Sequence, residues 1–179
     1  MLKRISWRVV PLVIFFTVAF FLWRGLNLDP HTLTSPIVGK RLPDFSLPAL
    51  MPQQPPFSSI SWRGKMVLLN VWASWCPACS EEQVFLMQLA REGVLIYGLN
   101  YKDNPQRART WLGEWGNPYL NIGVDPSGSS AMALGVSGTP ETFLIDSQGV
   151  LLYRHAGPMN SFVWQTEFLP KILQAQHKK

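Results

Sequence analysis

The chain has 179 residues, of which 47% are hydrophobic and 15% are charged, and it contains 8 Trp and 10 Phe. This composition excludes an intrinsically disordered chain, and the length suits one domain of ordinary size with a short additional segment. The net charge of +5 is concentrated at the N-terminus, because the first 28 residues hold four basic side chains and no Asp or Glu, whereas the remaining residues hold 12 basic and 11 acidic side chains. The basic balance therefore does not indicate binding to nucleic acid.

An apolar run covers residues 9–23 and is followed by Arg24. As a helix, this run would be about 22 Å long, which is shorter than a hydrocarbon core of about 30 Å. We therefore extend the predicted transmembrane anchor to residues 9–28, with Arg8 and Arg24 reaching outward. The alternative is a cleaved signal peptide, but residues 20–24 offer no small side chains for a cleavage site. We expect an uncleaved membrane anchor.

The basic N-terminus also predicts an orientation. Lys3, Arg4 and Arg8 precede the apolar run, and clustered positive charge stays on the cytoplasmic side. We therefore expect residues 1–8 in the cytoplasm, a polar tether at residues 29–37, and one domain at residues 38–179 on the outer side of the membrane.

Short predicted strands and helices alternate along that domain. Residues 42–57 are rich in proline and suit extended segments or a hairpin. Residues 66–73 form a near-continuous apolar run, which is typical of a strand buried on both faces. The elements expected after this strand are a helix at 77–91, a strand at 94–100, a helix at 105–115, a strand at 120–124, a short helix at 129–134, two strands at 141–146 and 150–155, and a C-terminal helix from Ser161 that Pro170 kinks.

This order of elements predicts the fold class. A β-α-β half is followed by a β-hairpin and a helix. Two cysteines, Cys76 and Cys79, lie at the first junction between a strand and a helix. We expect a thioredoxin-like α/β fold, a three-layer α/β/α sandwich with an N-terminal extension, preceded by one transmembrane helix.

The only two cysteines, Cys76 and Cys79, lie between the predicted strand at 66–73 and the predicted helix at 77–91. A zinc site needs four ligands, and there is neither a second cysteine pair nor a set of histidines with metal-site spacing. A purely structural disulfide is also disfavoured, because such a small loop removes little entropy from the unfolded chain.

Redox catalysis explains the position of the pair better. At a helix N-terminus, backbone N–H groups and the helix dipole stabilise the thiolate of Cys76. Cys79 lies one turn further on the same face, where it can attack a mixed disulfide at Cys76. The sequence therefore predicts a thiol–disulfide oxidoreductase that needs no metal or other cofactor.

Three residues outside the pair are further site candidates. A cis peptide before Pro140, facing the cysteines, would leave the Thr139 backbone free to pair with a substrate strand, although cis bonds are uncommon. Glu141 opens a predicted strand, where an acid is disfavoured, and beside the cysteines it could raise the thiol pKa and relay protons. Glu82 is a weaker candidate, because an acid in the first turn of a helix is commonly a partner of the helix dipole. Three others could line the pocket but are expected to serve in packing or at the surface: Asn70, Arg154 and His155.

Residues 71–79 (VWASWCPAC) resemble the active site of the membrane-tethered, TlpA/ResA-like branch of the thioredoxin family. Four further motifs narrow the resemblance, and in chain order they are residues 98–103 (GLNYKD), 116–119 (GNPY), 135–143 (GVSGTPETF) and 153–157 (YRHAG). Together they resemble the DsbE, or CcmG, family of thiol:disulfide interchange proteins in cytochrome c maturation. The resemblance covers nearly the whole chain.

The resemblance implies a periplasmic domain, held at the inner membrane, that keeps the haem-binding CxxCH cysteines of apocytochrome c reduced. It also implies a DsbD/CcdA-type membrane reductase as electron donor and haem-lyase components as further partners. By this resemblance Cys76 attacks and Cys79 resolves, Pro140 is cis, and Glu82 and Glu141 are the acids near the site.

The sequence departs from the related patterns at two places. Asn70 stands where ordinary thioredoxins carry a buried aspartate that accepts a proton. We therefore expect Glu141 to be the proton acceptor in this chain. Ala78 and Ser80 replace the Thr and Arg often found around the cysteines of the family. We expect the loss of a basic neighbour to alter the pKa of the reactive thiol and the choice of partner.

Other functions remain open at this point. A paralogue of the same fold could reduce other exported proteins or serve one dedicated haem assembly line, such as that of nitrite reductase. A Sco-type copper assembly protein would need CxxxC spacing and a positioned His. A peroxidase of the same fold would need a low-pKa cysteine preceded by a Thr/Pro-type loop.

Overall fold

The computed structural model describes the backbone of residues 2–26 and 37–177 and the side chains of residues 9–25 and 37–176. Residues 1, 27–36 and 178–179 lie outside the described residues, and with them nearly all of the predicted tether and the last two positions of the predicted anchor. The chain forms two units, Met1–Leu33 and Thr34–Lys179.

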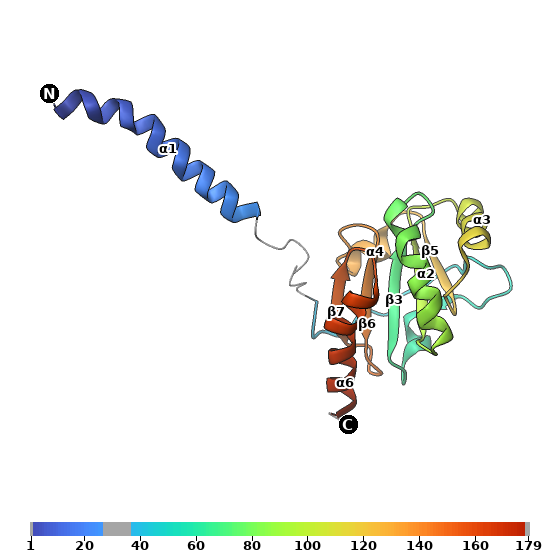
Figure 1. Ribbon diagram of the computed structural model, residues 1–179. Coiled ribbons are helices and arrows are strands. Elements are labelled where there is room, and N and C mark those ends of the chain that lie inside the picture. The colour runs from blue at the N-terminus through green and yellow to red at the C-terminus, as the bar shows by residue number, and fades with distance from the viewer. Residues whose placement is uncertain (1, 27–36, 178–179) are drawn as a thin grey trace. The chain divides into compact units, whose positions relative to one another are not determined.

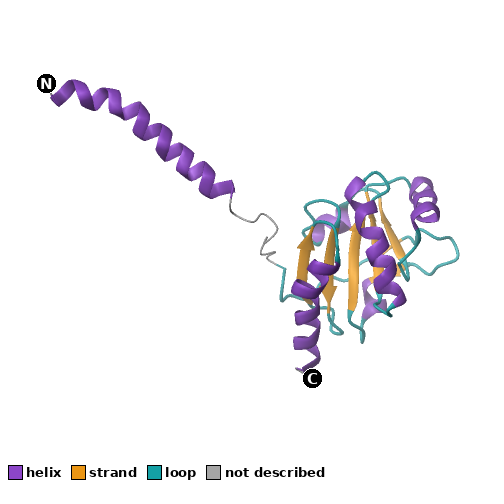
Figure 2. Ribbon diagram, in the orientation of Figure 1, coloured by secondary structure: helices purple, strands orange, loops and turns teal. Residues whose placement is uncertain are grey.

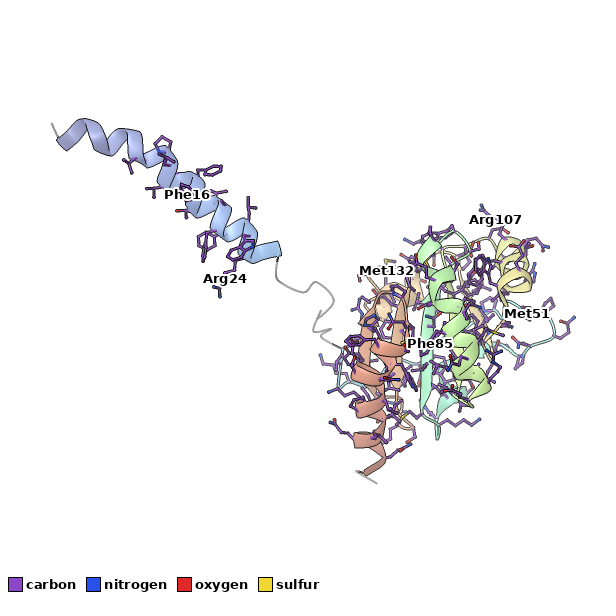
Figure 3. The ribbon with its side chains drawn as sticks, viewed as in Figure 1. Phe16, Arg24, Met51, Phe85, Arg107 and Met132 are labelled. Atoms are coloured by element: carbon purple, nitrogen blue, oxygen red, sulfur yellow. A yellow bond between two sulfur atoms is a disulfide. The ribbon has the colours of Figure 1, made fainter. Side chains whose placement is uncertain are left out.

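In the first unit the structure describes one helix, α1 (Leu2–Leu26), of 25 residues. It begins within the segment 1–8 that was predicted to precede the anchor. Its large apolar side chains from Val9 to Trp23 are exposed, and Figure 3 shows Phe16 and Arg24 projecting from the helix. Over the stretches of chain that the structure describes, we find no helix with both the length and the apolar character needed to cross a membrane.

The second unit is built on a five-stranded sheet with the strand order β5-β4-β3-β6-β7. β3 lies at its centre, parallel to β4 and antiparallel to β6 (Figure 1). Every residue of β3 is buried, as the apolar run at residues 66–73 predicts. The strands are β3 (Val67–Trp72), β4 (Ile96–Tyr101), β5 (Ile122–Asp125), β6 (Glu141–Ile145) and β7 (Leu151–Ala156).

Helices cover one face of this sheet (Figure 2). They are α2 (Pro77–Arg91), α3 (Pro105–Trp115), α5 (Ser161–Val163), the π-helical turn η2 (Trp164–Phe168) and α6 (Leu169–His177). Leu68 and Trp72 of β3 face a core cluster on this side, to which α2, α3 and η2 contribute. Phe85 of α2, labelled in Figure 3, packs against the same cluster.

The opposite face is covered by a shorter helix and by the N-terminal extension. These elements are β1 (Ser46–Leu47), β2 (Phe57–Ser58), the 3-10 helix η1 (Ser59–Trp62) and α4 (Ser129–Ala133). β1 and β2 pair antiparallel, so of the two arrangements expected in the proline-rich stretch, extended segments or a hairpin, the chain forms paired strands. Val67, Leu69 and Val71 of β3 face the core on this side, because successive strand residues point to opposite faces. The domain therefore has the three predicted layers.

The C-terminal helix is irregular where a kink at Pro170 was expected. Proline has no backbone N–H for a helical hydrogen bond. The chain forms the π-helical turn η2 before Pro170 and resumes as α6 at Leu169. Pro170 is then the second residue of α6, directly after this π-helical turn.

Candidate active site

Cys76 and Cys79 lie between the end of β3 and the start of α2 and are joined by a disulfide, with their Cα atoms 5.4 Å apart. Cys76 is the N-cap residue of α2, and its Sγ accepts a hydrogen bond of 3.2 Å from the backbone N–H of Cys79. Pro77 occupies the first helical position, where its missing N–H costs nothing. The same N–H group and the helix dipole favour a thiolate at Cys76 when the pair is reduced.

The loop before Cys76 is held by the segment that follows β4. The Asp103 carboxylate accepts hydrogen bonds from the backbone N–H of Ser74 at 2.6 Å and from its hydroxyl at 2.8 Å. Trp75 Nε1 donates to the Lys102 carbonyl at 3.0 Å. Lys102 adopts a φ of 45°, which is uncommon for a residue other than glycine. Residues 98–103, singled out above only as a motif, therefore position the cysteine loop.

Pro140 lies at the same end of the sheet as the cysteines, where β3 ends and β6 begins. The Thr139–Pro140 peptide is cis, as the resemblance implied. β6 begins directly after it and runs antiparallel to β3, with Glu141 opposite Val71. The start of β6 therefore meets the end of β3 from which the cysteine loop departs. Pairing of the Thr139 backbone with a substrate strand stays a prediction.

Glu82 is a buried carboxyl in the second turn of α2, with a side chain nearly inaccessible to solvent. One carboxyl oxygen accepts from Asn70 Nδ2 at 2.8 Å, and the other accepts from the backbone N–H of Met159 at 2.8 Å. Burial raises the pKa of Glu82 to about 7, against these two hydrogen bonds, which lower it. The interpretation of Glu82 as a first-turn dipole partner is wrong, because the residue lies deeper in the helix and faces the core.

Glu82 also lies close to Cys79 along α2. It follows Cys79 by three residues, so both lie on one face of α2, and both are 1% exposed. A carboxyl with a pKa of about 7 changes its protonation near neutral pH. Groups of this kind are candidates for proton transfer.

Glu141 is equally buried but has a different environment. Its carboxylate pairs with Arg154, through Nε–Oε2 at 3.0 Å and Nη2–Oε1 at 2.8 Å. The backbone N–H and hydroxyl of Ser137 and the backbone N–H of Gly138 also donate to Oε1. This arrangement balances the charge of Glu141 and fixes the loop that leads to Pro140. The geometry therefore favours Glu82 over Glu141 as a proton acceptor.

Asn70 is fully buried on β3 and contacts Glu82 directly. Its Nδ2 also donates to Thr142 Oγ1 at 3.1 Å, and its Oδ1 accepts from the Tyr119 hydroxyl at 2.8 Å. Burial and the nearby charge of Glu82 raise the pKa of Tyr119 well above its ordinary value. Sequence reasoning missed this network, although an asparagine inside an apolar strand was a signal for it.

Arg154 and His155 lie next to each other on β7 but do different things. Arg154 is buried against Glu141, so the expectation of a packing or surface role missed its ion pair. His155 Nδ1 instead lies 2.8 Å from Glu167 Oε2 in η2. Arg154 thus belongs to the site at the start of β6, whereas His155 ties the sheet to the C-terminal helices.

Comparisons with known proteins agree with this chemistry. The family model described as Redoxin matches residues 37–167. The chain is 44% identical over 166 residues to the thiol:disulfide interchange protein DsbE of Pseudomonas aeruginosa, covering 93% of this chain and 92% of the relative. It is 45% identical over 168 residues to the protein of the same name in Escherichia coli K12, covering 90% and 91% of the two chains.

A solved structure shows the same arrangement of elements. It is the crystal structure of a protein from Chlorobium tepidum described as a thiol:disulfide interchange protein DsbE, with a TM-score of 0.68 and 27% sequence identity. The match covers 79% of this chain and 99% of that chain. The fold of the second unit is therefore a thioredoxin-like α/β fold.

Proposed function

This chain belongs to the DsbE family of thiol:disulfide interchange proteins, and on that premise we propose that it reduces disulfides in the CxxCH segments of apocytochrome c during cytochrome c maturation. Its activity as a thiol–disulfide oxidoreductase follows from the family and from the Cys76–Cys79 pair. The choice of apocytochrome c as substrate rests on the motifs described above.

The redox pair carries the proposed reaction. The thiolate of Cys76 attacks one sulfur of the substrate disulfide, which forms a mixed disulfide and releases the other substrate sulfur as a thiolate that takes up a proton. Cys79, after losing its proton, attacks Cys76 Sγ and releases the second substrate sulfur in the same way. Two electrons pass from the cysteine pair to the substrate. The two released thiolates take up two protons, one of which balances the proton that Cys79 loses and one of which comes from solvent, and the Cys76–Cys79 disulfide remains.

Glu82 is the proposed acceptor of the proton that Cys79 loses. A thiol buried beside apolar groups holds its proton more strongly than an exposed one, so the second attack needs a nearby base. Glu82 lies on the same face of α2 as Cys79, and its pKa of about 7 lets it take a proton near neutral pH. Glu141, in its ion pair with Arg154, is assigned to holding the loop before Pro140.

The single observation that carries the function is the cysteine pair at the N-terminus of α2, where the Cys79 N–H contacts Cys76 Sγ. A strain that carries Cys76→Ala tests it, scored for holo-cytochrome c with and without an added dithiol reductant. We expect loss of holo-cytochrome c and rescue by the reductant. Normal holo-cytochrome c in the variant without reductant would contradict the proposal.

The substrate can be separated from the paralogue alternative with purified protein. The reduced domain is mixed with an oxidised CxxCH peptide and, separately, with an oxidised peptide in which the His is replaced by Ala and the cysteine spacing is changed. Faster reduction of the CxxCH peptide supports apocytochrome c as the substrate. Equal rates would favour a reductant for exported proteins in general.

We also propose that α1 anchors the protein in the bacterial inner membrane, with the redox domain in the periplasm. Support comes from the exposed apolar side chains along it and from the basic residues at its start. Extraction of membranes with alkaline carbonate should leave the full chain in the pellet and release a variant that lacks residues 1–28. Release of the full chain would contradict the anchor.

The proposed electron donor is a DsbD/CcdA-type membrane reductase, and haem-lyase components are proposed as further partners. The family resemblance supports both, and the donor is needed because each turnover leaves Cys76 and Cys79 oxidised. In cells that lack such a reductase, alkylation of free thiols should find the pair oxidised. A pair that stays reduced there would contradict this donor.

A further inference from the structure

Three buried side chains form a line that ends at Glu82. The Tyr119 hydroxyl donates to Asn70 Oδ1 at 2.8 Å, and Asn70 Nδ2 donates to the Glu82 carboxylate at 2.8 Å. All three residues are buried. Tyr119 comes from the loop before β5, Asn70 from β3 and Glu82 from α2, so the line connects three separate parts of the fold.

The register of the sheet explains how Tyr119 reaches Asn70. Asn70 is opposite Gly98 of β4. A Cβ atom at Gly98 would come within 2.9 Å of Trp72 Nε1 and 3.0 Å of Tyr119 Cγ, so only glycine leaves room for both rings. The Tyr119 ring stacks on Trp72, with centroids 5.6 Å apart and an angle of 13° between the planes. The ring is therefore held over Gly98 with its hydroxyl directed at Asn70.

The hydrogen bond from Tyr119 determines which end of the Asn70 amide faces Glu82. A tyrosine hydroxyl that donates to Asn70 must meet the amide oxygen, because the NH₂ group accepts no hydrogen bond. The NH₂ group then points to Glu82 and to Thr142 Oγ1 at 3.1 Å. If the amide turned over, its oxygen would face the Glu82 carboxylate and repel it.

We infer that Tyr119 is a positioning residue that, through Asn70, holds Glu82 ready to accept a proton from Cys79. This inference rests on the proposed role of Glu82 and adds two residues to it that act through Glu82 without touching substrate. It also assigns a task to the asparagine that replaces the buried aspartate of ordinary thioredoxins. Here the strand residue supplies the hydrogen-bond donor, and the helix supplies the carboxyl group.

Tyr119→Phe tests the inference, because it removes the hydroxyl and keeps the stacked ring. Without its donor the Asn70 oxygen is unpaired, and the amide can turn toward Glu82, so the charged form of Glu82 loses a hydrogen bond. We expect the pKa of Glu82, followed by ¹³C NMR of labelled glutamate in the reduced protein, to rise by about one to two units. Tyr97→Phe is the matched control, since Tyr97 is a buried tyrosine in the core cluster on the other face of the sheet, and it should leave the titration unchanged.

A second variant keeps the hydroxyl and moves the ring. Gly98→Ala forces Tyr119 or Trp72 to shift, and we expect the pKa of Glu82 to change in the same direction as in Tyr119→Phe. A titration of Glu82 that is unchanged in Tyr119→Phe would overturn the inference, whatever the effect of either variant on stability.

The kinetic test uses the attack of Cys79 on a mixed disulfide formed between Cys76 and a small chromogenic thiol. In Tyr119→Phe, the pH dependence of this step should move upward by the same one to two units, and the double variant with Glu82→Gln should behave like Glu82→Gln alone. A further shift from Tyr119→Phe in the Glu82→Gln background would overturn the inference. If Glu82→Gln leaves the wild-type profile intact, the proposed role of Glu82 fails, and the NMR titration alone still decides whether Tyr119 positions it.

Discussion

The two buried carboxyl groups beside β3 show how one residue type serves two purposes in a single domain. Glu82 and Glu141 are equally inaccessible, each 1% exposed. Glu141 is paired with the Arg154 guanidinium and receives hydrogen bonds from the loop before Pro140. Among the residues that the structure describes, the partners of Glu82 are uncharged groups, the Asn70 amide and the Met159 N–H.

The difference shows that the partner of a buried carboxyl, more than its burial, decides what it can do. A paired and fully hydrogen-bonded charge is costly to disrupt and therefore fixes the local structure. A carboxyl with neutral donors has only their hydrogen bonds to offset the cost of desolvating its charged form, and the cost that remains brings the pKa of Glu82 to about 7. Glu141 therefore organises the loop, while Glu82 is able to exchange a proton.

The largest effect is expected from removing the partner of Glu141. Arg154→Met leaves a buried carboxylate without its counter-charge, so the free energy of unfolding should fall by about 3–5 kcal/mol. Chemical denaturation at pH 7 measures the loss. Arg63→Met is the matched control, because it breaks the ion pair with Asp44 at 2.7 Å, in which both side chains are largely exposed, and it should cost no more than about 1 kcal/mol. Equal losses in the two variants would contradict the comparison.

The second prediction concerns the pH dependence of stability. The pKa of Glu82 lies near 4.5 in the unfolded chain and about 7 in the folded protein, so between these values the folded state holds a proton that the unfolded state has lost. The stability that Glu82 contributes is thus fully present below pH 4.5 and is lost as the pH rises to about 7. Over this range the free energy of unfolding should fall by about 3 kcal/mol. Unfolding curves at a series of pH values should show this decrease in the wild type.

Glu82→Gln removes the titrating group and should remove this part of the slope. The difference between wild type and variant isolates Glu82 from the other groups that titrate in the same range. An identical slope in both proteins would mean that Glu82 is charged across the whole range, as a paired carboxylate would be.

The smallest effect is expected at a residue that supports the ion pair. The Ser137 hydroxyl donates to Glu141 and accepts from Arg154 Nη2 at 3.0 Å. Ser137→Ala should lower the free energy of unfolding by about 1–2 kcal/mol, because two hydrogen bonds to charged groups are lost while the ion pair stays. Ser61→Ala is the control, because it removes an exposed hydroxyl that donates to the Ser58 carbonyl. It should lower the free energy of unfolding by no more than about 0.5 kcal/mol, which is usual for a surface substitution. A loss in Ser137→Ala as small as that of the control would mean that the hydroxyl adds nothing to the Glu141 pair.

Local patterns in the sequence were enough to predict most of the domain and the redox pair. The helix predicted at residues 77–91 has the bounds of α2, because Pro77 marks its start and Gly93 follows its end. The apolar run at 66–73 predicted β3, since a strand covered on both faces needs apolar side chains throughout. The position of Cys76 at the start of α2 follows from these two elements.

The contacts of the two carboxyl groups could not be predicted in the same way, because they depend on register between distant segments. Glu82 contacts Asn70 only because α2 packs on the face of the sheet to which the Asn70 side chain points. Tyr119 reaches Asn70 because Gly98, opposite Asn70 on β4, leaves room for its ring. The pairing of Glu141 with Arg154 likewise depends on the register of β6 and β7. By local pattern alone Glu82 looks like an ordinary acid near a helix start, and only the family resemblance indicated that it lies near the site.

Proton transfer to Glu82 can be tested by the rate at which Cys79 attacks a mixed disulfide at Cys76, measured as a function of pH in the wild type, Glu82→Gln and Glu141→Gln. We expect a rate that rises through pH 7 in the wild type and in Glu141→Gln. In Glu82→Gln the rate at pH 7 should fall by about 10²-fold and the inflection near pH 7 should disappear. A wild-type profile in Glu82→Gln, or loss of the inflection in Glu141→Gln alone, would contradict the assignment of proton transfer to Glu82.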